Sequence, residues 1–318
     1  MAGRVPRIFV TGIYAVDLVF TGSRLPVPGE TVPASGFMRS HGGKGSNQAI
    51  AAARAGAEAI FFSFIGDDSF GKDASAVWRA EGVVDKTATI KGQVTGAASI
   101  FVDERTGSNA IAVFPGASRL MQASDIDRLE SDIAASDVFV VQLEQPIVVA
   151  CRGLELARKH RVATILNPAP AACLPDDIYS LCDYILPNES EASLLTGLPV
   201  GTVKEAEAAA RVLLDKGVGN VIVTLGEKGA LYCNAQETFL VDPVNAGACV
   251  DTTGAGDGFT AGFAVALSKG LAPRAAMEFA ATLAGISVTR HGAAVSMPTL
   301  AEIEARQKHR TNIESTAS

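Results

Sequence analysis

The alternation of short apolar runs with alanine-rich stretches limits the fold of this chain more than any other feature of its sequence. Runs rich in β-branched and aromatic residues indicate strands at 7–12, 59–64, 137–143, 162–167, 184–187 and 220–226. Alanine-rich stretches indicate helices at 45–56, 69–80, 146–160, 203–216, 257–269 and 274–288. The strands are apolar almost throughout, so we expect helices on both faces of their sheet. The sequence therefore predicts an α/β fold with a doubly wound, mostly parallel sheet.

Two segments, at about 13–40 and 95–115, depart from this alternation. The first is extended and interrupted by proline and glycine turns, and the second has the pattern of a hairpin around residues 104–107. We expect both to form a small β-sheet that projects as a lid from a single domain of residues 1–318. A sheet of so few strands leaves an apolar face exposed, so we expect a homodimer formed through this lid sheet.

Charge and cysteine content narrow the class of partner and the compartment. The 27 basic and 34 acidic side chains give a formal net charge of −7, which argues against binding to nucleic acid or to an anionic membrane. No window approaches the roughly 20 apolar residues of a membrane span, and the first residues lead into a strand instead of a secretory leader. The five cysteines form no CxxC pair, and the four histidines show no zinc spacing. We therefore expect a reduced, cytoplasmic protein with buried thiols.

The strongest functional signal is the segment 250–267, VDTTGAGDGFTAGFAVAL. Gly254 and Gly256 allow a tight turn that aims free amide groups outward from the start of an apolar helix. Those amides and the positive end of the helix dipole form an anion site. A carboxylate at Asp257 would not help to bind an anion, but it could accept the proton of a hydroxyl group that attacks a phosphoryl group. The alternative is a glycine turn in which Asp257 only caps the helix.

Two common phosphate-binding motifs do not occur in this sequence. A Walker loop requires Ser or Thr after Gly-Lys, and neither Gly43-Lys44 nor Gly71-Lys72 is followed by one. A dinucleotide fingerprint opens an early βα unit with GxGxxG, whereas residues 254–259 are GAGDGF and lie late in the chain. Both of the nucleotide folds that carry these motifs are therefore disfavoured.

A second functional signal is the segment 41–57, HGGKGSNQAIAAARAGA. Adjacent glycines allow a ligand to approach the backbone at Gly43, while Lys44 and Asn47 supply hydrogen-bond donors. A neutral polyol is held by such a mixture of amide and ammonium groups. The alternative is an ordinary junction between a loop and a helix, which would not explain two glycines beside a lysine.

The pairing of GGKGSNQA near the start with DTTGAGDGF near the end resembles the carbohydrate kinases of the ribokinase type, the PfkB family. The resemblance covers almost the whole chain and includes, in the family's order, PGETV (28–32), IGDDSFG (65–71), QLEQP (142–146), LNPAPA (166–171), PNESEA (187–192), TLGEKGA (224–230) and VTRHGA (288–293). GGKGxNQA and NPAPA are typical of the ribokinase branch, whereas the superfamily shares the later motif. The resemblance implies a ribokinase-like fold and an ATP-dependent sugar kinase.

The resemblance also implies a role for each matching residue at the reacting centre. Asp257 would be the general base, and Gly254, Ala255 and Gly256 would form the anion hole that meets charge on the γ-phosphate. The sugar hydroxyls would be held by Asp17, Gly43, Lys44, Asn47 and Glu144, together with Asp257. A buried carboxylate such as that of Glu144 is costly unless it has a partner, which favours a functional role for it.

The nucleotide and metal sites follow from the same resemblance. ATP would be bound by Asn188, Thr224, Gly226 and Gly256. Asn188 and Glu191 would place Mg²⁺ through water, because this ion keeps its hydration shell. K⁺ would lie behind the anion hole, held by Asp251, Thr253, Ser287, Arg290, Gly292 and Ser296. Asn188 could alternatively be only a helix cap, and Ser296 only a turn residue.

The first strand departs from the pattern of the family. Ribokinases usually have GSxNxD at its end, and this chain has Gly12-Ile13-Tyr14-Ala15-Val16-Asp17, so that Ala15 replaces the Asn that contacts the 2- and 3-hydroxyls of ribose. Deoxyribokinases of the same branch also have an apolar residue followed by Val-Asp at this place. Ribose and 2-deoxyribose therefore compete as substrates, and Tyr14 could supply a replacement donor. A nucleoside or hexose kinase, and a sugar sensor without catalysis, are the other classes considered.

Overall fold

A nine-stranded sheet organises the computed structural model, which describes residues 4–316 and the side chains of residues 4–309. The strands lie in the order β15-β14-β13-β12-β11-β10-β1-β4-β6. All neighbours are parallel except β13–β14 and β14–β15. Their bounds are β1 Arg7–Thr11, β4 Glu58–Phe62, β6 Val84–Asp85, β10 Val138–Val141, β11 Ala163–Leu166, β12 Tyr184–Ile185, β13 Asn220–Thr224, β14 Ala230–Cys233 and β15 Thr238–Val241.

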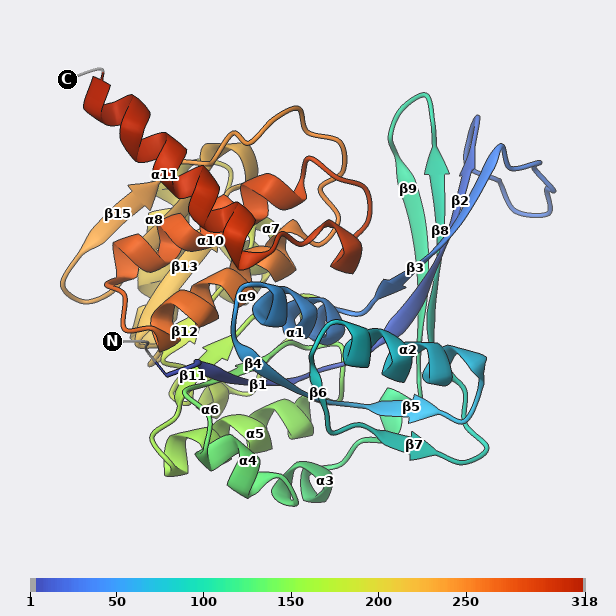
Figure 1. Cartoon of the computed structure of the whole chain (residues 1–318), viewed down its shortest axis with the longest axis horizontal. Coiled ribbons are helices and arrows are strands. Elements are labelled where there is room, and N and C mark those ends of the chain that lie inside the picture. Colours follow the sequence, from blue (N-terminus) through green and yellow to red (C-terminus); the bar gives the residue numbers. More distant parts are fainter. Residues whose placement is uncertain (1–3, 317–318) are drawn as a thin grey trace.

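Side chains alternate between the two faces of this sheet and meet a different set of helices on each. On β1, Ile8 and Val10 belong to one hydrophobic core and Phe9 to the other. The first core is closed by α1 Lys44–Arg54, α2 Ser69–Ala80, α9 Ala255–Ser268, α10 Pro273–Ser287 and α11 Leu300–Thr316. The second is closed by α3 Ala123–Asp127, α4 Glu130–Ala134, α5 Ile147–Lys159, α6 Asp176–Tyr179, α7 Glu189–Thr196 and α8 Val203–Asp215 (Figure 1). The predicted doubly wound α/β fold is confirmed.

The order of the strands reverses between β1 and β10. From β1 the chain adds β4 and β6 on one side of the sheet and then returns to add β10 to β13 on the other. The connections after β1 and β10 consequently diverge and leave a crevice at the carboxyl ends of these strands, where doubly wound proteins bind their ligands. If the two predicted functional segments, 41–57 and 250–267, form one ligand site, we expect them to meet at this crevice.

A second sheet of four strands stands away from the main sheet on the right of Figure 1. Its order is β3-β2-β8-β9, with β2 Ala15–Gly22, β3 Gly36–Gly42, β8 Thr95–Asp103 and β9 Asn109–Gly116. The predicted hairpin is confirmed, because β8 and β9 are antiparallel. Two short strands, β5 Phe64–Gly66 and β7 Ala88–Ile90, pair separately below it. Short 3₁₀ turns, η1 Ala117–Leu120, η2 Gly226–Lys228 and η3 Ala294–Ser296, complete the described elements.

Glycines bring the start of α1 into contact with the end of β1. A Cβ atom on Gly45 would lie 2.6 Å from the Cα of Gly12, so neither position has room for a side chain. Gly43 has φ 86°, and a Cβ there would lie 2.5 Å from the carbonyl oxygen of Ile13. The GGKGSNQ segment can therefore lie directly over the crevice. Within the described residues, no helix is both long enough and apolar enough to cross a membrane.

Candidate active site

A cavity of about 220 Å³ lies at the carboxyl ends of β11, β12 and β13, beside the start of α9. Seven of the predicted site residues line it: Lys44, Asn188, Glu191, Thr224, Gly254, Gly256 and Asp257. The other lining residues are Asn167, Ala169, Leu186, Thr252 and Thr260. The tertiary structure thus brings together residues from five separate parts of the chain.

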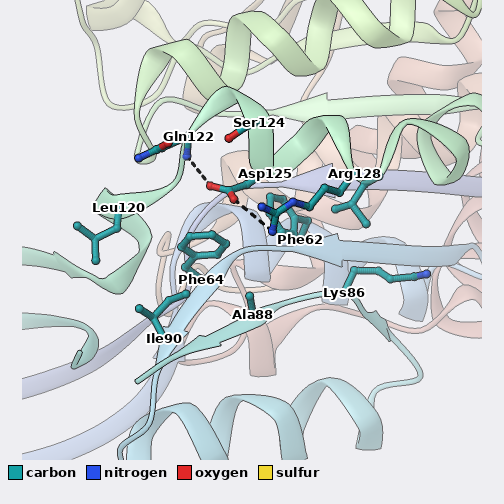
Figure 2. Close-up of a pocket in the computed structure, with 11 residues that line it drawn as sticks. Phe62, Phe64, Lys86, Ala88, Ile90, Leu120, Gln122, Ser124, Asp125 and Arg128 are labelled. Atoms are coloured by element: carbon teal, nitrogen blue, oxygen red, sulfur yellow. Dashed lines mark hydrogen bonds and ion pairs between the residues drawn. The ribbon is translucent and has the colours of Figure 1, made fainter. Parts of the chain in front are cut away.

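A larger hollow of about 510 Å³ lies elsewhere and contains none of the predicted residues (Figure 2). Its charged groups are already paired, two with each other and one with a residue outside the hollow. Asp125 accepts a hydrogen bond from the amide of Gln122 at 2.8 Å and lies 3.8 Å from the guanidinium of Arg128, as Figure 2 shows. Lys86 lies 3.0 Å from Asp132, outside the hollow. The smaller cavity is therefore the candidate active site.

Asp257 lies in the first turn of α9 and is almost fully buried, with 6% of its surface exposed. Both of its carboxylate oxygens accept hydrogen bonds from amide side chains of α1. Asn47 Nδ2 donates to Oδ2 at 2.9 Å, and Gln48 Nε2 donates to Oδ1 at 3.0 Å. The two predicted functional segments therefore meet at this buried carboxylate. Within the described residues, no Lys, Arg or His side chain forms an ion pair with it.

The backbone before Asp257 presents free donors to the cavity. Gly254 caps α9 in the left-handed conformation, with φ 78°. The amide of Ala255 donates to the carbonyl of Thr252 at 3.2 Å, while those of Gly254, Gly256 and Asp257 donate to no acceptor within the described residues. Free amides at the start of a fourteen-residue helix form a site for an anion.

A cluster of acidic groups surrounds Lys44 on the other side of Asp257. The backbone amide of Lys44 donates to Glu144 Oε2 at 2.7 Å. Burial raises the pKa of Glu144 to about 7. Burial, and then the charge of Asp257, raise the pKa of Asp17 to about 6. The negative charge of Asp257, followed by that of Glu144, raises the pKa of Lys44, so its ammonium group stays charged among these carboxylates.

The remaining residues of the predicted sugar site lie at the base of the second sheet and do not line the cavity. The carboxylate of Asp17 lies over Gly42, because a Cβ on that glycine would be 2.2 Å from Asp17 Oδ2. Ala15 lies opposite Gly42 in the strand register and shares this face with Asp17. Gly43, Asn47 and Glu144 adjoin the same region through the contacts given above. Asn47 Oδ1 is buried and has no hydrogen-bond partner among the described residues.

Tyr14 points to the opposite face of the second sheet. Its hydroxyl group lies 2.7 Å from Nδ1 of His41, which pairs with Val16 in the register. Its ring packs edge-on against Trp78, and the side chain is fully buried. The hydroxyl of Tyr14 is therefore turned away from the face that carries Ala15 and Asp17.

The predicted Mg²⁺ residues form a capping box at the start of α7. Asn188 Oδ1 accepts from the amide of Glu191 at 2.8 Å, and Glu191 Oε2 accepts from the amide of Asn188 at 2.8 Å. The helix-cap alternative is thus realised, yet both residues also line the cavity. One oxygen of Glu191 has no hydrogen bond within the described residues, and burial raises the pKa of this carboxyl. That oxygen fits the hydrated Mg²⁺ of a nucleotide.

Two of the predicted K⁺ residues, Thr253 and Gly292, contact the carboxylate of Asp251. Its two oxygens accept from the amides of Thr253 and Gly292, each at 2.9 Å, which joins the segment before α9 to the loop after α10. The carbonyl oxygens of Thr253, Arg290 and Gly292 accept no hydrogen bond within the described residues. The hydroxyl groups of Ser287 and Ser296 donate to backbone carbonyls at 2.8 Å. Open carbonyls beside one carboxylate suit a monovalent cation, and no group of three or more His, Cys, Asp or Glu side chains in the described chain suits a transition metal.

Two further predicted residues do not line the cavity, and three residues that were not predicted are connected to Asp257 by hydrogen bonds. Ala255 does not line the cavity, although it stands between Gly254 and Gly256, which do. Gly226 does not line it either and follows the lining residue Thr224 by two positions. Gln48, Asn167 and Gln142 form a buried chain of amides that ends on Asp257. Gln48 and Asn167 lie inside the motifs GSNQA and LNPAPA, but nothing in the sequence shows which side chains of a motif point inward.

The fold and this site define the class of the protein: it is a phosphotransferase that acts on an alcohol group of a sugar. The crevice of a doubly wound sheet holds a buried carboxylate beside free amides at a helix start, as such a reaction requires. The chain belongs to the pfkB family of carbohydrate kinases, whose family model matches residues 5–300.

A ribokinase, a deoxyribokinase and a solved ribokinase structure are similar to this chain over nearly their whole lengths. The chain is 39% identical to a ribokinase of Haemophilus influenzae over 298 residues, which are 92% of this chain and 95% of the relative. It is 38% identical to a deoxyribokinase of Salmonella typhi over 298 residues, with 92% and 96% of the two chains covered. The structure of Arabidopsis thaliana ribokinase complexed with ribose and ATP matches with a TM-score of 0.88 and 29% identity, over 95% of this chain and 99% of that one.

The raised pKa of Glu144 predicts how the stability of the ligand-free protein depends on pH. Because the pKa rises from 4.5 to about 7 on folding, the folded state binds the proton more tightly. The free energy of unfolding should therefore fall between about pH 5 and pH 8, by up to about 3 kcal/mol from this group. Glu144→Gln should remove this part of the fall, as measured by urea unfolding at both pH values. Glu227→Gln, at an exposed position, should keep the wild-type pH dependence. An equal fall in the free energy of unfolding of the wild type and of Glu144→Gln would contradict the raised pKa of Glu144.

Proposed function

We propose that this protein transfers the γ-phosphate of ATP to the primary 5-hydroxyl of a pentofuranose. The observation that carries the proposal is the buried carboxylate of Asp257, held between Asn47 and Gln48 and next to free amides of the α9 start. A base beside an anion site can accept the proton of a hydroxyl group while it attacks phosphorus. The ribokinase relatives, and the neighbour that holds ribose and ATP, support this substrate pair.

The sugar is proposed to bind between the second sheet and Asp257. Carboxylates at Asp17 and Glu144 would accept hydrogen bonds from hydroxyl groups, and Lys44 would donate them. The buried, unpartnered Oδ1 of Asn47 needs a donor, which a hydroxyl group of the sugar supplies. Asp257 then accepts the proton of the 5-hydroxyl. Because Asp17 belongs to β2, closure of the second sheet as a lid would bring this carboxylate to the sugar and exclude water.

The nucleotide is proposed to occupy the cavity lined by Asn188, Thr224 and the α9 start. The amides of Gly254 and Gly256 would stabilise the charge that develops on the transferred phosphoryl group, with Ala255 joining them if its bond to Thr252 opens. Gly226, directly after β13, would lie beside the nucleotide. Asn188 and Glu191 would hold Mg²⁺ through water, and the bound ion would neutralise phosphate charge.

A monovalent cation is proposed to stabilise the loop that carries the anion site. Asp251, Ser296 and the carbonyl oxygens of residues 253, 287, 290 and 292 would hold K⁺ there. A Cβ on Gly254 would lie 2.9 Å from Ala293, so the loop after α10 packs directly behind the α9 start. A cation in this loop would therefore fix the position of the anion site without touching the sugar.

Ala15 favours 2-deoxyribose as the second candidate substrate. Ala15 shares a face with Asp17, where it offers no hydrogen-bond donor or acceptor for a 2-hydroxyl group. Tyr14 cannot replace the missing donor, because its hydroxyl group lies against His41 on the other face. An unmade hydrogen bond costs about 1–3 kcal/mol, which is roughly ten- to hundred-fold in binding. A sugar without the 2-hydroxyl group avoids this cost, and a deoxyribokinase is among the relatives.

We expect 2-deoxyribose to be used at least as efficiently as ribose, because the site lacks a partner for the 2-hydroxyl group. A coupled assay of ATP turnover against ribose, 2-deoxyribose, fructose and adenosine, with and without K⁺, measures kcat/KM for each. Ala15→Asn should shift the ratio of ribose to 2-deoxyribose toward ribose by about 10- to 100-fold. Tyr14→Phe should leave the ratio unchanged. A ribose preference above about 100-fold in the wild type would exclude 2-deoxyribose, and turnover of adenosine or fructose alone would reject the pentose.

Asp257→Asn should lower kcat by at least about 100-fold, because the amide cannot accept the proton of the hydroxyl group. Steady-state kinetics with saturating sugar and ATP measure the loss. The KM for ATP and the Tm should change little, since the asparagine keeps the size of the side chain. Asp242→Asn, at an exposed position, is the control. Turnover close to that of the wild type in Asp257→Asn would refute the general base.

The second sheet is proposed to pair two copies of the chain. Its strand register places Met38, Val19, Ile100 and Ile111 in one row, and Phe37, Phe20 and Phe101 in a row on the other face. Phe37 is 63% exposed and Ile111 55% exposed in the single chain. Exposed apolar side chains on both faces of a projecting sheet are typical of a protein interface. The same sheet of a second copy would bury these side chains against apolar side chains of its own.

We expect the mass of a dimer in light scattering at micromolar concentration. Ile111→Arg should yield the monomer, because the arginine would bring an uncompensated charge into the proposed interface. Leu194→Arg should stay dimeric, since this equally exposed residue lies on α7, away from the second sheet. A monomeric mass for the wild type would reject the pairing.

The cytoplasm is proposed as the compartment of this reaction. ATP is the proposed phosphoryl donor, and the five cysteines are free thiols, two of them buried. Burial raises the pKa of the Cys182 thiol, which keeps it protonated and unreactive.

A further inference from the structure

The carboxylate of Asp257 is held by two amides that differ in one respect. Both Asn47 and Gln48 are buried, and each donates to one of its oxygens, at 2.9 Å and 3.0 Å. Asn47 keeps an unpartnered oxygen, so it can still contact a substrate. Gln48 has no such freedom, because every polar atom of its amide has a partner within the protein.

The partners of Gln48 fix which way its amide faces. Its Oε1 accepts a hydrogen bond from Nε2 of Gln142. Its Nε2 donates to Oδ1 of Asn167 at 3.1 Å as well as to Asp257, which uses both of its hydrogens. Asn167 is fixed in turn, since its Nδ2 donates to the carbonyl of Leu186 at 3.0 Å. One chain of donors therefore runs from Gln142, after β10, through Gln48 to Oδ1 of Asp257. A second runs from Gln48 through Asn167, after β11, to the carbonyl of Leu186, after β12.

This arrangement gives the two carboxylate oxygens different surroundings. Oδ1 faces Gln48, which is 0% exposed and does not line the cavity. Oδ2 faces Asn47, whose unpartnered oxygen marks the side where a hydroxyl group can bind. A base has to present a lone pair within about 2.6–3.2 Å of the oxygen atom whose proton it accepts, so rotation of the carboxylate would misplace that lone pair.

We propose that Gln48 is a positioning residue for the reaction: it holds Oδ1 of Asp257 so that Oδ2 meets the attacking hydroxyl group. The inference rests on the proposed role of Asp257 as the base. Gln48 itself contacts neither the sugar nor the nucleotide. Its loss should therefore lower kcat and leave the KM of both substrates nearly unchanged, because the binding groups stay in place.

The test replaces Gln48 by methionine, which has nearly the same shape and no donor. Gln48→Met should lower kcat by about 10- to 100-fold and change the KM for the sugar and for ATP by less than threefold. Gln145→Met is the matched control. This residue is also buried and loses a single hydrogen bond, to the carbonyl of Gln142, but it does not contact Asp257. The control should keep kcat within about threefold of the wild type at a temperature where both variants are folded.

A double-mutant cycle separates positioning from a merely structural role. If Gln48 acts through Asp257, then Gln48→Met should have no further effect on kcat in an Asp257→Asn background. If Gln48 only supports the fold, the reductions of kcat in the two single variants should multiply in the double variant. This outcome would overturn the proposal. An active Asp257→Asn single variant would instead overturn the proposed base, so the two failures are distinguishable.

A second variant keeps the proposal testable if Gln48→Met does not fold. Gln142→Met removes the donor to Gln48 and leaves the bond from Gln48 to Asp257 possible. It should lower kcat by a smaller factor, at least about threefold, and only while Asp257 is present. An unchanged kcat in Gln142→Met, or an equal loss in the Asp257→Asn background, would contradict the proposal.

Discussion

The contact between the carboxylate of Asp257 and two amides of α1 is the interaction on which the rest of the structure depends. The partners lie 210 and 209 positions apart in the chain, and both are buried. A charge in the interior is tolerated only with such partners, since burial without them is costly. The pairing requires α1 and α9 to lie side by side over the main sheet, as Figure 1 shows. That packing in turn places the free amides of the α9 start next to the carboxylate of Asp257.

Close backbone contacts make this arrangement possible. Gly12 and Gly45 allow α1 to begin against the end of β1, and Gly254 allows the α9 start to pack on the loop after α10. The same closeness concentrates negative charge, because Glu144, Glu191 and Asp257 lie close to Lys44. Asp17 in turn lies close to Asp257 and Glu144. Burial then raises the pKa of Glu144 and of Asp17. A ligand with hydroxyl groups, as proposed for this site, would donate hydrogen bonds to these carboxylates and so stabilise their charged form.

Much of the fold could be predicted from the sequence, because its strands and helices carry strong local patterns. The six predicted strands and six predicted helices all correspond to elements of the structure, within a few residues. The antiparallel strands β14 and β15 were not predicted, since no alternation of polar and apolar residues marks either of them. The pair β5 and β7 is shorter still, and only its contact in space identifies it as a sheet. Short strands gain their stability from their neighbours, and the neighbours are set by the tertiary fold.

The sequence by itself determined the elements, the motifs and the apolar residue Ala15 in the proposed sugar site, because each of these is a property of neighbouring residues. Only the tertiary structure decided how the motifs combine. It turned Tyr14 toward His41, and it placed the helix cap formed by Asn188 and Glu191 at the cavity. It gave every polar atom of the Gln48 amide a partner but left the oxygen of the Asn47 amide without one. The physical reason is that a side chain's hydrogen-bond partners come from distant parts of the chain. Which atoms stay free for a substrate is known only after all of those partners are in place.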